Sequence, residues 1–101
     1  MNIHTTHAKD RIIIAPCGDI DEHTAREIRR AIDNAIQQGP GSITLDFQQV
    51  DFMDSTGIGM MLSRYRAMQN CGIELTVANP NRQVDKVLRL TGIYSIIKQV
   101  R

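Results

Sequence analysis

The residues whose types and spacing could carry chemistry lie together at positions 51–59, which read DFMDSTGIG. This segment follows an expected strand and opens an expected helix. Loops at the carboxyl ends of strands are where ligands commonly meet α/β proteins. Ser55 falls at the helix start, as the N-cap or in the first turn. The purely structural explanation is that Asp and Ser cap helices and that Gly allows a tight entry.

A nucleophilic serine is one chemical interpretation, because a serine between a strand and a helix is the arrangement of the hydrolase elbow. That motif needs glycine two residues before and two residues after the serine. Gly57 fits, but Met53 occupies the other position. The base would have to be His4, His7 or His23, and His23 is expected on the surface of a first helical turn. The pattern therefore disfavours hydrolysis.

Two further interpretations are also weak. In an aspartic-protease half-site the aspartate lies among strands with glycine two residues later, whereas here Thr56 intervenes and a helix follows. Nucleotide binding at Gly57-Ile58-Gly59 would need a third glycine in register or a P-loop lysine, and neither is present. Helix capping remains the default explanation of the pattern.

The composition is that of one small globular domain. The chain has 101 residues, and 42% of them are hydrophobic, which supports a core. Twelve basic and eleven acidic residues give a net charge of +1. The basic residues are scattered, with Arg29 and Arg30 as the only adjacent pair, so the basic stripe typical of nucleic-acid binders is missing.

The ends and the cysteines indicate a cytoplasmic protein that does not enter a membrane. Residues 1–10 are polar and lack the apolar region of a signal peptide. No apolar run approaches the roughly 18 residues of a membrane span. Two cysteines are weak evidence for a disulfide. We therefore expect Cys17 and Cys71 to be reduced and buried as small hydrophobes.

The first half of the chain predicts a hairpin and a helix. Residues 11–16 contain three consecutive isoleucines and favour a strand, paired with residues 2–7 across a turn at 8–10. An apolar stripe at helical spacing follows, formed by Ala25, Ile28, Ile32, Ala35 and Ile36. Asp21 or Thr24 can cap this helix, and Thr24 and Glu27 have the spacing of a capping box.

The second half alternates strands and helices. We expect, in order, a strand at 42–47, a loop at 48–54, a helix with an apolar stripe from Ile58 to Met68, a strand at 73–78, a helix that begins at Asn79-Pro80-Asn81 and stops at Gly92, and a short strand or helix at 93–100. The order favours a single α/β domain, with helices packed on a mixed sheet of four or five strands.

Three segments resemble the anti-sigma factor antagonists, members of the STAS domain family. Residues 53–59 (MDSTGIG) resemble the family signature Asp-Ser-Ser/Thr-Gly-Leu/Ile-Gly. Residues 18–21 (GDID), followed by HTA, resemble its helix-opening Gly-Glu-Leu-Asp segment. Residues 90–93 (LTGI), followed by two isoleucines at 96–97, resemble the end of its third helix. The likeness covers essentially the whole chain and implies one STAS domain over residues 1–101.

The resemblance implies a regulator that acts by binding rather than by catalysis. In this family the unphosphorylated antagonist binds an anti-sigma factor that is also a serine kinase, and this frees a sigma factor. The kinase phosphorylates the serine after the motif aspartate, here Ser55, and a phosphatase reverses the change. The kinase brings ATP and Mg²⁺, so the antagonist needs no cofactor. The alternative is a STAS domain in a signalling or transporter-accessory role without a sigma factor.

A phosphate on Ser55 would change the surface more than the fold. It adds a charge of about −1.5 to −2. The helix dipole favours an anion at that end by about 0.3–1 kcal/mol, and nearby carboxylates oppose it. A partner meeting the extra charge would lose several kcal/mol of binding. The residues implied in partner binding are Asp21, Asp54, Ser55, Thr56, Gly57 and Ile58.

Several of these residues have an equally good structural role. Asp21 and Asp54 are also candidate helix caps, and Gly57 suits either close approach of a partner or tight packing. Ile58 continues the apolar stripe and is expected in the core rather than at a contact. Off that stripe, Met60 is expected on the surface. The remaining two helix methionines, Met61 and Met68, are expected to fill the core.

Overall fold

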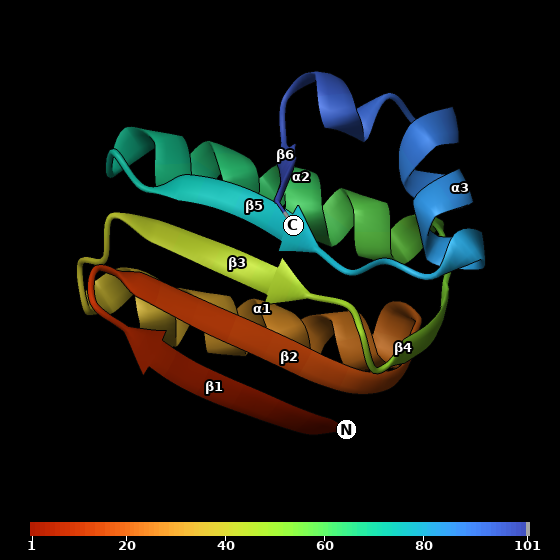
Figure 1. Cartoon of the computed structure of the whole chain (residues 1–101), viewed down its shortest axis with the longest axis horizontal. Helices are drawn as coiled ribbons and strands as arrows, with labels where there is room; N and C mark the ends of the chain where they lie inside the picture. The colour runs from red at the N-terminus through yellow and green to blue at the C-terminus, as the bar shows by residue number, and fades with distance from the viewer. Residues whose placement is uncertain (101) are drawn as a thin grey trace.

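The computed structural model describes residues 1–100 (Figure 1). Within them the elements are, in chain order, β1 (Asn2–Ala8), β2 (Arg11–Ile20), α1 (Glu22–Gln37), β3 (Ser42–Asp46), β4 (Val50–Met53), α2 (Ser55–Asn70), β5 (Glu74–Ala78), α3 (Arg82–Leu90), the 3-10 helix η1 (Ile93–Ser95) and β6 (Lys98–Val100). The described residues thus form a six-stranded mixed sheet with three α-helices. The expected α/β class is confirmed.

The long strand β2 organises the sheet. The strand order is β1-β2-β3-β5-β6, and β4 pairs with β2 off this path. β1 is antiparallel to β2, and all other pairings are parallel. β2 pairs with β3 as far as Ile14 and with β4 from Gly18 onward. Pro16, which has no N–H to donate, falls in the gap between these two pairings, so the strand passes through it.

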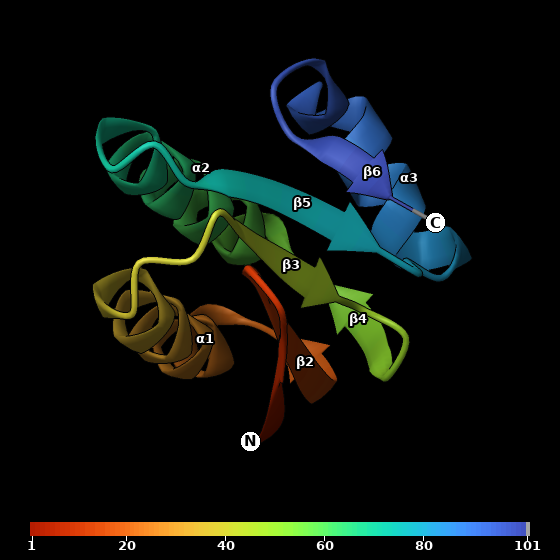
Figure 2. The ribbon, with the colours of Figure 1, turned by 60° about the vertical axis from the view of Figure 1, so that its left-hand side comes forward.

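Helices α1 and α2 lie side by side on one face of the sheet (Figures 1 and 2). The core beneath them is made of alternate strand residues and the inward stripes of the helices, and its largest fully buried members include Ile14, Ile28, Ile43, Leu45, Phe47, Met53 and Met61. On β3 and β5, Thr44 and Thr76 are buried and their hydroxyls share a hydrogen bond of 2.8 Å. No helix within residues 1–100 is long and apolar enough to cross a bilayer.

The C-terminal part is fastened by side-chain contacts. Asn81 caps α3 by accepting a hydrogen bond from the Val84 N–H at 2.8 Å. Asp85 of α3 accepts hydrogen bonds from Arg89 Nε and from the Tyr94 hydroxyl, both at 2.7 Å. Partial burial, together with this hydrogen bond, raises the pKa of Tyr94 well above its usual range. These contacts hold η1 against α3.

Two strand predictions were wrong, because one strand was not expected and another was expected to end too early. Residues 48–54 were expected to form a loop, but Val50–Met53 is strand β4. Its Asp51 and exposed Phe52 break the apolar alternation that marks a strand, and the segment is extended because it pairs with the far end of β2. β2 itself continues to Ile20 instead of stopping at Pro16. The terminal segment contains both expected alternatives, η1 followed by β6.

Predictions for individual side chains had mixed outcomes. Met61 and Met68 are fully buried, as expected. Met60 was expected on the surface but is only 8% exposed, because it faces α1. Both cysteines are free thiols, but Cys71 is exposed because it forms the C-cap of α2, and Cys17 is only half-buried.

Candidate functional site

The pairing of β2 with β4 brings the starts of α1 and α2 together. The last paired residues of the two strands are Ile20 and Met53. Each is followed at once by the N-cap aspartate of a helix, Asp21 for α1 and Asp54 for α2. The Asp54 N–H donates to the Ile20 carbonyl at 3.1 Å. The two carboxylates line one surface hollow of about 440 Å³, together with residues of the first turns of α1.

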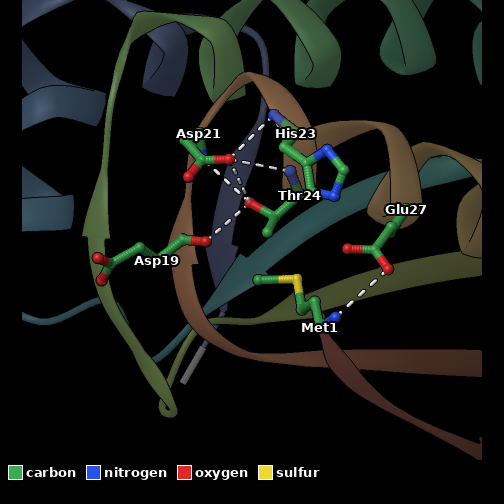
Figure 3. Close-up of polar contacts among 6 residues, drawn as sticks. All are labelled: Met1, Asp19, Asp21, His23, Thr24 and Glu27. Carbon is green, nitrogen blue, oxygen red and sulfur yellow. Dashed lines mark hydrogen bonds and ion pairs between the residues drawn. The ribbon is translucent and has the colours of Figure 1, made fainter.

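The start of α1 is a closed capping box (Figure 3). Asp21 Oδ1 accepts from the backbone N–H groups of His23 at 2.9 Å and Thr24 at 3.0 Å. In return, Thr24 Oγ1 accepts from the Asp21 N–H at 3.0 Å and donates to the Asp19 carbonyl at 2.7 Å. The hydrogen bond from the Thr24 N–H is the main reason that the pKa of Asp21 is lowered, despite an opposing desolvation effect.

Of the two candidate caps, Asp21 is confirmed, and the box expected from Thr24 and Glu27 is wrong. The helix begins one turn earlier than that box would require, because β2 runs directly into it. Thr24 is therefore the closing residue of the box rather than its first. Glu27 instead lies 3.3 Å from the amino group of Met1. Figure 3 draws this ion pair as a dashed line.

The start of α2 is capped differently. Asp54 Oδ1 accepts from the Thr56 N–H at 2.9 Å and also from the Thr56 hydroxyl. The third helical residue, which is Thr24 in α1, is here Gly57, so no side chain can return a hydrogen bond to the cap. A Cβ at this glycine would lie 2.8 Å from Met53 Cγ and 2.9 Å from Ile20 Cγ2. Close packing on the ends of both strands therefore requires glycine.

Ser55 is the first residue of α2 and is exposed. Among residues 1–100 no hydrogen-bond partner is found for its hydroxyl, whereas the hydroxyl of neighbouring Thr56 is held by Asp54. The exposed Ser55 side chain is therefore accessible to a modifying enzyme. The two adjacent hydroxyls therefore differ, because that of Thr56 is bound by Asp54 and that of Ser55 is exposed.

The structure separates the expected partner-binding residues into two groups. Asp21, Asp54, Ser55 and Thr56 lie at one surface. Gly57 and Ile58 do not lie there, because both are buried and Ile58 is only 7% exposed. The alternatives of tight packing and core filling are confirmed for these two residues, and partner contact stays a prediction. Their role is to seat the helix that presents Ser55.

Two residues that position this site were not found from the sequence. Gln83 of α3 binds both backbone groups of Met53, accepting from its N–H at 3.0 Å and donating to its carbonyl at 3.2 Å. Arg64 of α2 forms an ion pair with Asp33 of α1 and is largely buried, with 13% of its side chain exposed. No spacing pattern links residues thirty positions apart, so only the folded structure reveals these contacts.

Comparison with known proteins identifies the fold and its relatives. The sequence model of the STAS domain family matches residues 2–101. An anti-sigma F factor antagonist from Paenibacillus polymyxa is 32% identical over 98 residues, which are 96% of this chain and 84% of the relative. The unphosphorylated anti-sigma factor antagonist SpoIIAA superposes with a TM-score of 0.83 at 26% identity, covering 99% of this chain and 89% of the other.

A second similar structure is that of a phosphorylated protein. The Bacillus cell fate determinant SpoIIAA in its phosphorylated form superposes with a TM-score of 0.74 at 26% identity, covering 99% of this chain and 92% of the other. The chain therefore belongs to the STAS domain family, as its sequence motifs indicate. Within that family it is similar over nearly its whole length to anti-sigma factor antagonists.

Proposed function

We propose that this chain is an anti-sigma factor antagonist controlled by phosphorylation of Ser55. In the unphosphorylated state it binds an anti-sigma factor that is also a serine kinase, and so frees a sigma factor for transcription. Phosphorylation by that kinase switches the antagonist off, and a phosphatase restores it. The exposed Ser55 hydroxyl at the start of α2 carries this proposal, together with the similarity to SpoIIAA, which is known in both states.

The geometry around Ser55 supports binding rather than catalysis. A nucleophilic serine needs a base within hydrogen-bond reach. The Ser55 hydroxyl has no such partner among residues 1–100, and the nearby acidic groups are Asp21 and Asp54, which cap helices. A small domain presenting an exposed hydroxyl between two carboxylates is suited to a change of charge at a binding surface.

The surface that a partner would meet is defined by four side chains, those of Asp21, Asp54, Ser55 and Thr56. A neutral Ser55 beside two carboxylates suits a partner surface that carries a basic group. A phosphate would add about −1.5 to −2 charges to this already acidic surface and would meet the partner in a desolvated contact. The capping bonds of Asp21 and Asp54 do not involve Ser55, so the fold remains intact.

The test is phosphorylation by the cognate anti-sigma factor kinase with ATP and Mg²⁺, followed by mass spectrometry. One phosphate should be added to the wild type and to Thr56→Ala, and none to Ser55→Ala. Thr56→Ala is the matched control because it removes the adjacent hydroxyl. Phosphate uptake that persists in Ser55→Ala but disappears in Thr56→Ala would contradict the assignment of the site.

A further inference from the structure

Arg26 of α1 lines two surface hollows that also border the residues on either side of Ser55. A hollow of about 440 Å³ is lined by Asp54 and the first turns of α1, and a second of about 230 Å³ is lined by Thr56 and Gly59 of α2. Arg26 lines both. Asp54 and Thr56 flank Ser55 in the chain, so the two hollows that Arg26 lines meet the start of α2 on both sides of this serine.

Arg26 is free to move toward a group attached to the Ser55 hydroxyl. Its ion pair with Glu22 is long, at 3.8 Å, and the two side chains are 73% and 80% exposed. Exposed pairs of this kind contribute little to stability because water and salt screen them. Gly59 presents no side chain, and a Cβ built there would meet nothing within 4 Å, so the space between Arg26 and the start of α2 is open.

The backbone N–H groups at the N-terminal end of α2 are poorly able to hold a phosphate. The Thr56 N–H is already taken by the Asp54 carboxylate at 2.9 Å, and the Gly57 N–H by the Asp54 carbonyl at 3.1 Å. A phosphate on Ser55 would also lie near the negative charges of Asp21 and Asp54. A phosphate in this position therefore needs a cation, and an arginine can bind it through two parallel hydrogen bonds.

We propose that Arg26 is the intramolecular partner of a phosphate on Ser55. On phosphorylation its guanidinium leaves Glu22 and binds the phosphate across the two hollows, which links α1 to the start of α2. This inference rests on the proposed function for the presence of the phosphate. Phosphorylation then adds an anion to the partner surface and also draws the guanidinium of Arg26 away from Glu22.

The test uses protein with phosphoserine placed at position 55 during synthesis through an expanded genetic code, so that no kinase is required. The phosphate is titrated by ³¹P NMR. Its second pKa should lie below the value of about 6 for a free phosphoserine. Arg26→Gln should raise the affinity of the phosphate for its proton about threefold, which is the size expected for a partly exposed ion pair. Arg26→Lys should retain part of the effect.

Other charged groups face the same position and require controls. They are Asp21, Glu22, His23 and Arg29 from α1 and its cap, and Asp54 from the cap of α2. Arg66→Gln removes one positive charge from an exposed site farther along α2 and should leave the titration unchanged. Equal curves for Arg26→Gln and Arg66→Gln would overturn the inference, and so would loss of the whole effect in His23→Gln with none in Arg26→Gln.

Failure of this inference is distinguishable from failure of the proposed function. A phosphate that ignores Arg26 in the synthetic phosphoprotein overturns the inference even if the kinase modifies Ser55. A titration that responds to Arg26 supports the inference even if the kinase modifies another residue, which would contradict the proposed function instead.

Discussion

The two helices that begin at this end of the sheet have the same N-cap residue but different first turns. In α1 the third helical residue is Thr24, whose hydroxyl returns a hydrogen bond to the cap and closes the box. In α2 the third residue is Gly57, because the helix lies against Ile20 and Met53 and leaves no room for a side chain. One start is closed and structural, whereas the other leaves Ser55 with an exposed hydroxyl.

The difference shows how a similar local motif supports two roles. Asp21 and Asp54 both accept a hydrogen bond from a backbone N–H of the first turn of their helix, yet only the start of α2 presents a hydroxyl that the cap does not use. The tight packing of Gly57 on the strands fixes the position of the α2 start without consuming the Ser55 side chain. The site therefore combines a tightly packed helix start with an exposed serine hydroxyl.

The largest expected effect on stability concerns Gly57. Gly57→Ala should lower the free energy of unfolding by about 1–3 kcal/mol, because the added methyl group overpacks the core against Met53 and Ile20. Urea unfolding measures this. The matched control is Gly59→Ala, whose methyl group enters open space and should raise stability by up to about 1 kcal/mol. Equal losses in the two variants would contradict the packing argument.

The next effect distinguishes the two caps. Thr24→Val keeps the side-chain shape but removes the hydroxyl that closes the box, and should cost about 1 kcal/mol of stability. Thr56→Val should cost about half as much, because Asp54 keeps its hydrogen bond from the Thr56 N–H. Thermal or urea unfolding of both variants measures the difference. A larger loss in Thr56→Val would show that the α2 start is the more tightly closed one.

The smallest effect is a pH dependence at the α1 start. The pKa of Asp21 is lowered from its ordinary value of 3.8, so the folded state binds this proton less readily than the unfolded state. The ionised Asp21 carboxylate stabilises the folded state at pH values above its ordinary pKa. This stabilisation is lost as the pH falls through the lower pKa that Asp21 has in the folded state. The melting temperature should therefore drop less between pH 5 and pH 2 in Asp21→Asn than in the wild type.

A suitable control for this pH dependence is Asp51→Asn, which also removes one carboxylate, from an exposed residue of strand β4. It controls for the change in net charge alone. If Asp21→Asn and Asp51→Asn change the fall in melting temperature between pH 5 and pH 2 equally, the capping bonds of Asp21 are not the source of the effect.

The sequence predicted the layers of the fold because its periodicities are strong. The stripe of α1, the three isoleucines of β2 and the helix start at Asn79-Pro80-Asn81 are local signals, and each is confirmed. Strand β4 was missed because Asp51 and the exposed Phe52 interrupt its pattern. Its extended conformation comes from pairing with β2 and from Gln83, and neither contact is local in sequence.

The candidate site was predicted only in part, because only its motif residues carry a local signal. Motif spacing located Ser55, Asp54 and Asp21, which the structure places together at the paired ends of β2 and β4. The apolar stripe placed Ile58 in the core, as the structure confirms, although the family resemblance also placed it among the residues implied in partner binding. Arg26 was overlooked because it lies on the polar face of α1, where exposed arginines carry no distinctive pattern.

The most direct test of the central claim compares two forms of the chain that differ only at Ser55. The affinity for the cognate anti-sigma factor is measured by isothermal titration calorimetry for the unmodified chain and for the chain with phosphoserine at position 55. The phosphate should weaken binding by about ten- to a thousandfold, while the fold remains intact. Equal affinities of the two forms would contradict the claim that Ser55 is the switch.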